Sequence, residues 1–135
     1  MLDLVLIQHL HSGVNLIEYI EAETTLNSKH SSIFSGFLSA IQSMSKELEI
    51  GHIALISTEG ENAHNCIIVT NEPISIVLIV DRKDSIEKWK ETGHKLLNAF
   101  FKIYGRDFDP YEISEFKDFR FIIKEICDLY KNPIY

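Results

Sequence analysis

Residues 74–80, ISIVLIV, form the stretch that most restricts how this chain can fold. All of these residues except Ser75 are large and apolar. A strand with one face in water alternates apolar and polar residues, whereas a continuous apolar run has both faces covered. Residues 4–7, LVLI, show the same pattern near the start of the chain. Both segments are therefore expected at the centre of a sheet with helices on both faces.

The rest of the sequence predicts the elements around these two strands. Short runs rich in β-branched and aromatic residues predict strands at residues 2–10, 14–20, 50–57, 64–70 and 74–81. Apolar residues spaced three and four apart predict helices at residues 27–48, 84–104 and about 114–130. Residues 84–87 have the form of a capping box in which Asp84 is the cap. The order β-β-α-β-β-β-α-α predicts a single α/β (α+β) domain over residues 1–135, with one helix on one face of the sheet and two on the other.

The charge of the chain argues against nucleic acid and against direct membrane insertion. The formal net charge is −7, and carboxylates flank the short basic clusters. Phosphate groups and anionic lipids both require grouped cations, and no apolar run is long enough to span a bilayer. Cys66 and Cys127 lie in apolar runs and predict buried thiols rather than a disulfide framework. We therefore expect a cytoplasmic protein that reaches a membrane, if at all, only through its partners.

The sequence offers few groups for catalysis or metal binding. It contains no glycine-rich phosphate-binding motif and no nucleophile elbow. His9 and His11 could present two imidazoles at a strand end, but no Cys or acidic residue stands beside them at ligand spacing. An acid/base pair, or merely a solvated loop, could be formed by Glu59, Glu61 and His64. We expect no enzyme, no metal and no cofactor.

The first predicted helix carries two sets of residues. In residues 31–48, SSIFSGFLSAIQSMSKEL, the large apolar set is expected to face the core and comprises Phe34, Phe37, Ile41, Met44 and Leu48, with Ile33 and Leu38 widening it. The small set beside it comprises Ser35, Gly36, Ser39, Ala40 and Ser43. Gly36 inside a helix costs roughly 1 kcal/mol relative to Ala, whereas small residues three and four apart let another backbone approach closely. That backbone could belong to the sheet beneath, to a second copy of the helix or to a partner protein.

In its order of elements, and in residues 34–48 after an initial hairpin, the chain resembles the longin fold of the roadblock/longin group. It is similar in particular to the small stand-alone longin-like proteins of archaea related to eukaryotes. The resemblance implies a five-stranded antiparallel sheet of order 2-1-5-4-3, which agrees with the central positions inferred for residues 4–7 and 74–80. It also implies a non-enzymatic domain that dimerises with itself or with a related longin or roadblock protein. Such domains serve as platforms for small Ras-like GTPases or as vesicle-trafficking adaptors.

The resemblance also assigns an interaction surface, formed by the first helix and the neighbouring edge strand. On the helix, the expected partner-binding residues are Ser35, Gly36, Ser39, Ala40 and Ser43. On the edge strand, they are Ile50, His52, Ala54 and Ile56. An alternative, suggested by the aromatic density of the last two helices, is a small-molecule sensor of profilin-like or PAS-like shape.

Overall fold

The computed structural model describes residues 1–21, 24 and 28–131. Their elements follow in the order β1 (Leu2–His9), β2 (Asn15–Ile20), α1 (Ser28–Glu47), β3 (Leu55–Ser57), β4 (His64–Asn71), β5 (Ile74–Asp81), α2 (Ile86–Tyr104), the 3-10 helix η1 (Ile113–Phe116) and α3 (Phe119–Lys131). All the strand pairs are antiparallel, and the sheet order is β2-β1-β5-β4-β3. The predicted fold is therefore confirmed, including the central positions of β1 and β5. Asn27, predicted as part of the start of the first helix, lies outside the described residues.

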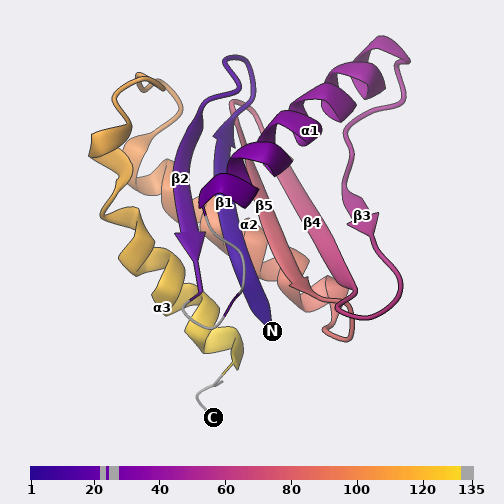
Figure 1. Cartoon of the computed structure of the whole chain (residues 1–135). Helices are drawn as coiled ribbons and strands as arrows, with labels where there is room; N and C mark the ends of the chain where they lie inside the picture. The colour runs from indigo at the N-terminus through magenta and orange to yellow at the C-terminus, as the bar shows by residue number, and fades with distance from the viewer. Residues whose placement is uncertain (22–23, 25–27, 132–135) are drawn as a thin grey trace.

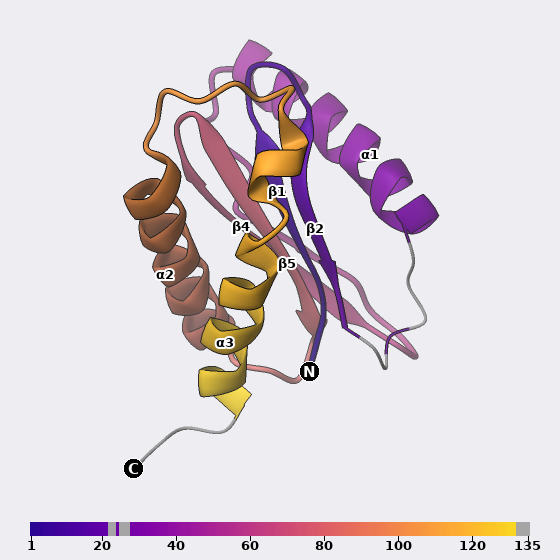
Figure 2. The ribbon, with the colours of Figure 1, turned by 90° about the vertical axis from the view of Figure 1, so that its left-hand side faces the viewer.

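The sheet is the middle of three layers (Figures 1 and 2). α1 crosses one face obliquely, and α2 and α3 cover the other. Along β5, Ile76 and Leu78 belong to the core cluster under α2 and α3, whereas Val77 belongs to the cluster under α1. Successive side chains of a strand point to opposite faces, so the apolar run of β5 serves both layers.

The two layers of core differ in size. Under α2 and α3, the largest fully buried side chains are Trp89, Phe100, Phe116 and Phe119. Under α1, the buried cluster is smaller and comprises Leu6, Leu38, Cys66, Ile68 and Val77. Since stabilisation by burial scales with the apolar area removed from water, α1 is held to the sheet more weakly than the other two helices.

Two helix boundaries differ from the prediction. Ser85, not Asp84, is the N-cap of α2, because its hydroxyl accepts a hydrogen bond from the Lys88 backbone N–H at 3.3 Å. The Asp84 carboxylate instead accepts a hydrogen bond from the buried indole N–H of Trp89 at 2.9 Å. The last predicted helix is also divided, because a separate 3-10 turn precedes α3. Gly105 ends α2 as expected, with φ at +71° and its N–H bonded to the Phe101 carbonyl oxygen.

Candidate functional site

α1 turns large apolar side chains away from the sheet. Ile33, Phe37, Met44 and Leu48 are each more than half exposed, and we call these four residues the outer apolar face. Their spacing places them within one narrow sector of a helix with 3.6 residues per turn. The prediction that Ile33, Phe37, Met44 and Leu48 point into the core is therefore wrong. Leu38 is buried, as predicted, and marks the side of α1 that docks on the domain.

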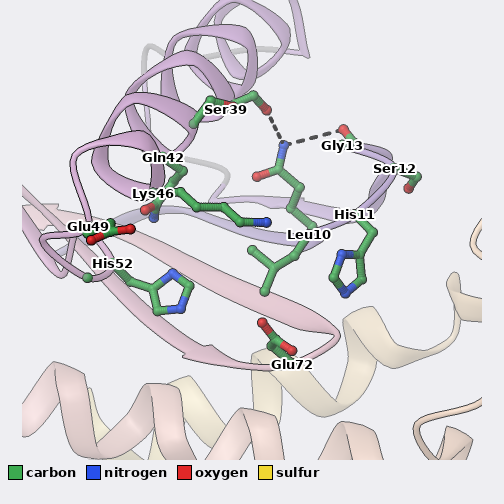
Figure 3. Close-up of a pocket in the computed structure, with 13 residues that line it drawn as sticks. Leu10, His11, Ser12, Gly13, Ser39, Gln42, Lys46, Glu49, His52 and Glu72 are labelled. Atoms are coloured by element: carbon green, nitrogen blue, oxygen red, sulfur yellow. Dashed lines mark hydrogen bonds between the residues drawn. The ribbon is translucent and has the colours of Figure 1, made fainter.

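Two of the small residues of α1 bind the domain's own sheet. Ser35 is buried, and its hydroxyl donates to Asn15 Oδ1 at 2.8 Å and accepts from Gln8 Nε2 at 3.0 Å. The Ser39 hydroxyl accepts from the same Gln8 nitrogen at 3.2 Å (dashed line in Figure 3). Polar side chains of β1 and β2 therefore select the serine side of the helix. Ser35 and Ser39 were predicted to form an outward surface, and Ser35 cannot reach a partner from this position.

The other three small residues remain exposed beside the outer apolar face. Gly36, Ala40 and Ser43 are solvent-accessible, and their helical positions place them next to Phe37 and Met44. A Cβ atom built on Gly36 would meet nothing within 4 Å. The domain's own sheet therefore does not explain this glycine. Close approach by a second copy or by a partner stays a prediction.

The predicted edge strand is shorter than expected. β3 covers only Leu55–Ser57, so Ile50, His52 and Ala54 lie before it and Ile56 alone lies within it. The Ala54 carbonyl oxygen still accepts a hydrogen bond from the Ile68 N–H of β4 at 3.0 Å. The side chain of Ile56 is half-buried and packs against the cluster under α1. Ile50, His52 and Ala54 are exposed, so three of the four predicted side chains stay accessible beside the short strand.

Side chains of α1 explain why residues 50–53 leave the sheet. Gln42 accepts from the Ile53 N–H at 2.9 Å and donates to the Ile53 carbonyl oxygen at 3.3 Å, as a neighbouring strand would. The Ser45 hydroxyl donates to the carbonyl oxygen of Gly51. Gly51 also has φ at +90°, a conformation that an extended strand of L-residues does not use. This segment is therefore tied to the end of α1.

The loop residues predicted as acid/base candidates do not gather into one site. Glu59 and Glu61 are exposed. His64 lies at the start of β4, where its Nε2 pairs with a carboxylate oxygen of Asp3 on β1. Its other ring nitrogen lies 2.5 Å from the Asn62 carbonyl oxygen. Both ring nitrogens are thus engaged, so the pair fastens two strands together. No motif links residues so far apart, and sequence reasoning missed this contact.

Cys66, predicted as a buried thiol, and the His9 and His11 pair have environments typical of structural residues. Burial raises the pKa of the Cys66 thiol to about 12, the opposite of what a nucleophilic cysteine requires. The rings of His9 and His11 lie edge to face, 5.9 Å apart. Burial, and then the neighbouring His11, lower the pKa of His9. Within residues 1–21, 24 and 28–131, no group of three or more His, Cys, Asp or Glu side chains is placed to hold a metal ion.

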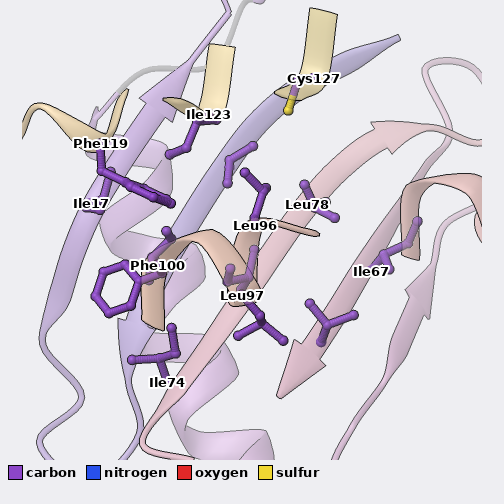
Figure 4. Close-up of a cluster of buried hydrophobic side chains, with 14 of the residues drawn as sticks. Ile17, Ile67, Ile74, Leu78, Leu96, Leu97, Phe100, Phe119, Ile123 and Cys127 are labelled. Carbon is purple, nitrogen blue, oxygen red and sulfur yellow. The ribbon is translucent and has the colours of Figure 1, made fainter. Parts of the chain in front are cut away.

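The aromatic residues of the last two helices form a packed cluster. Phe100 of α2 stacks on Phe116 at 5.7 Å between ring centroids and meets Phe119 edge to face at 5.5 Å. Figure 4 shows Phe100 and Phe119 among the aliphatic side chains over the sheet. Phe100, Phe116 and Phe119 are fully buried. The feature that suggested a PAS-like ligand domain is therefore explained by core packing.

Comparison with known proteins places this architecture. No family model and no curated protein matches the sequence. The chain superimposes on a Roadblock/LC7 domain from Streptomyces avermitilis with a TM-score of 0.57 and 10% identity, over 76% of this chain and 84% of that one. It superimposes on Myxococcus xanthus MglB with a TM-score of 0.54 and 14% identity, over 75% of this chain and 85% of that one. This chain has the roadblock/longin fold.

Within this roadblock/longin fold, the features exposed for recognition are the outer side of α1 and the edge of the sheet formed by β3. The outer apolar face follows α1, and the short edge strand β3 comes soon after its end (Figure 1). None of the described helices is long and apolar enough to cross a membrane. The features left for recognition are thus an apolar helix face and a neighbouring sheet edge.

Proposed function

We propose that this chain is a non-enzymatic interaction domain that self-associates through the outer apolar face of α1 and the edge of β3. The observation that carries the proposal is the outward position of Ile33, Phe37, Met44 and Leu48 on one side of a helix. Contiguous apolar side chains on the surface of a soluble domain are typical of protein interfaces. The domain acts in the cytoplasm and reaches membranes only through its partners.

A two-fold arrangement would use both features at once. Antiparallel pairing of two β3 edges continues the sheet from one copy into the next, and the two α1 helices then lie side by side on the same face. Gly36, Ala40 and Ser43 would let the helices approach closely. The pairing would also cover a sheet edge that is otherwise open to unwanted strand addition.

The expected affinity is moderate. Phe37, Met44 and Leu48 are already about half buried in the single chain. Covering the rest on both copies contributes about 5–9 kcal/mol, given about 1.5–3 kcal/mol for complete burial of one such side chain. Association itself costs about 4–15 kcal/mol. Hydrogen bonds at the β3 edge are therefore needed for a stable dimer, and we expect reversible dissociation at micromolar concentration.

The proposed dimer would be a platform for a small Ras-like GTPase or for a trafficking-type complex. The support for this partner is the resemblance of the chain to longin and roadblock domains together with the shared fold. The lack of an assembled catalytic site among the described residues agrees with a binding role. A related longin or roadblock protein could replace the second copy, which would make the platform a heterodimer.

Sedimentation velocity tests the self-association. Phe37→Asp should shift the protein to monomer, because a charge on the outer apolar face would be buried in the dimer. Phe121→Asp is the matched control, since Phe121 is a similarly exposed phenylalanine on α3, on the opposite side of the sheet. The control should leave the dimer intact. A wild-type protein that stays monomeric at high micromolar concentration, or a Phe37→Asp dimer of unchanged affinity, would refute the proposal.

A nucleotide-release assay tests the GTPase platform. The protein is mixed with small Ras-like GTPases of the same genome that carry a fluorescent guanine nucleotide, and light scattering measures the mass of any complex. Faster release or a stable complex supports the platform, and Gly36→Leu should weaken it if the exposed helix surface is the contact. A clean dimer that binds no GTPase would restrict the surface to self-association.

A further inference from the structure

A cavity lies under the C-terminal half of α1, on the side of the helix that faces the sheet. Its volume is about 710 Å³, within the usual range of small-molecule sites. The cavity is bounded by α1, by the turn between β1 and β2, by residues 49–52 and by the turn between β4 and β5 (Figure 3). It exists because residues 50–53 follow α1 instead of β4 and leave the end of the sheet uncovered.

Gln8 of β1 is the most buried polar side chain of the cavity wall, with an exposed fraction of 6%. Its Nε2 lies within hydrogen-bond distance of Ser35 Oγ, Ser39 Oγ and the Gly13 carbonyl oxygen. The Gly13 oxygen can only accept, so the amide nitrogen must lie on that side and the amide oxygen on the other. No hydrogen-bond partner of Oε1 occurs among the residues that the structure describes. An acceptor on the cavity wall is thus available to a donor in the cavity.

Gln8 begins a polar row across the sheet. It pairs in register with Ser75 of β5, which pairs with Thr70 of β4. Thr70 Oγ1 is the one buried side-chain nitrogen or oxygen in the described part of the chain that lacks a hydrogen-bond partner. The adjacent row on this face is apolar and comprises Leu6, Val77 and Ile68. Polar side chains under a helix cost free energy unless they are satisfied. Of this row only Gln8 lines the cavity, so Gln8 alone indicates a polar occupant there.

Charged groups of both signs surround the opening. The Lys46 side chain extends from α1 into the cavity, and Glu72 lies across from it (Figure 3). Neither side chain forms an ion pair with another described residue. The imidazoles of His11 and His52 lie on either side of the space between them. The cavity therefore offers the Lys46 ammonium to an anionic group of a ligand. It offers the Glu72 carboxylate and the Gln8 amide oxygen to a cationic donor of the same ligand.

We propose that this cavity binds a small zwitterion of the α-amino-acid type. The ligand carboxylate lies against the Lys46 ammonium, and the ligand ammonium donates toward Gln8 Oε1 and Glu72. The remaining volume holds the ligand side chain beside Leu10 and the imidazoles. This site goes beyond the proposed interaction role, since it does not use the outer apolar face. Of the small helix residues proposed for self-association, Ser43 alone also lines the cavity.

Calorimetric titration of the full chain with each proteinogenic amino acid, to millimolar concentration, tests the site. At least one amino acid should bind saturably. Two analogues of that amino acid then test the charge pattern, namely the hydroxy acid that lacks the ammonium and the amine that lacks the carboxylate. Each should bind roughly tenfold or more weakly, because each loses a charge-assisted hydrogen bond.

Two variants locate the binding. Lys46→Met should weaken it roughly tenfold or more, whereas Lys83→Met, an exposed lysine at the opposite end of β5, should leave it unchanged. Phe37→Asp should bind as wild type does, so a failed dimerisation proposal leaves this test intact. The inference is overturned if no amino acid binds, if the hydroxy acid binds equally well, or if Lys46→Met has no effect.

Discussion

The two glycines inside helices of this domain should respond in opposite ways to the same substitution. Gly93 lies in α2 against the sheet, and a Cβ atom there would be 2.8 Å from Val69 Cγ2 and 3.1 Å from Leu78 Cδ1. Gly36 lies in α1, and a Cβ atom there would meet nothing within 4 Å. Gly93→Ala should therefore destabilise the domain, and Gly36→Ala should stabilise it.

The expected changes in the free energy of unfolding follow from two contributions, the helix propensity of alanine and the overpacking of the core by its methyl group. Replacing glycine by alanine inside a helix raises the free energy of unfolding by about 0.5–1 kcal/mol. At Gly93 this gain is outweighed, because Val69 and Leu78 are buried and overpacking a core by one methyl costs about 1–3 kcal/mol. We expect a net loss of about 1–2 kcal/mol for Gly93→Ala. For Gly36→Ala only the higher helix propensity of alanine contributes, so we expect the free energy of unfolding to rise by about 0.5–1 kcal/mol.

Urea unfolding followed by circular dichroism measures both changes. Each alanine is introduced into the Phe37→Asp background, so that self-association does not contribute to the free energy of unfolding. The midpoints should move in opposite directions at an unchanged denaturant slope. A Gly93→Ala variant as stable as its parent would refute the close approach of α2 to the sheet. A loss of stability in Gly36→Ala would refute the open position of that glycine in the single chain.

Three further predictions follow from buried polar groups. Ser35→Ala should lower the free energy of unfolding by about 1–2 kcal/mol. The control Ser43→Ala, at an exposed serine of the same helix, should lower it by less than about 0.5 kcal/mol. Equal effects of the two substitutions in urea unfolding would contradict the inward position of Ser35. Burial raises the pKa of the Cys66 thiol to about 12, so the folded state keeps a proton that the unfolded state, with a pKa near 8.5, releases. The free energy of unfolding should therefore fall as the pH rises above about 9. The Cys66 thiol of the native protein should also resist alkylation by iodoacetamide. Rapid labelling of native Cys66 at pH 8 would refute its burial. Asp84→Ala removes the acceptor shared by the Trp89 indole N–H and the Met1 ammonium and should cost about 1–2 kcal/mol in the same unfolding assay. Unchanged stability would show that these two contacts contribute nothing.

The sheet could be predicted from the sequence because its signals are local. A continuous apolar run such as ISIVLIV has no polar face to turn to water, so the strand that contains it must be covered on both sides. The structure places this strand and residues 4–7 at the sheet centre, between α1 and the pair α2 and α3. Gly105 could be assigned to a helix end for a similar reason, because glycine readily adopts the positive φ found there.

Contacts between distant residues could not be predicted in this way. The segment before Leu55 was expected to be a strand, but Gln42 and Ser45 of α1 bind its backbone. The Asp3–His64 pair and the cavity beside Gln8 likewise depend on how separate elements meet. Side chains that replace a neighbouring strand leave no periodic trace in the sequence.

The sequence by itself determined the order of the elements, the central strands and the presence of helices on both faces. The tertiary structure alone decided which side of α1 faces inward. By periodicity Phe37, Met44 and Leu48 were expected in the core, yet Gln8 and Asn15 present polar groups on the opposing strands. Gln8 Nε2 and Asn15 Oδ1 form hydrogen bonds with the serine side of the helix. Burying these atoms against phenylalanine and methionine would leave those hydrogen bonds unmade. The amphipathic pattern shows that a helix has two different sides, but the surface it meets decides which one is buried.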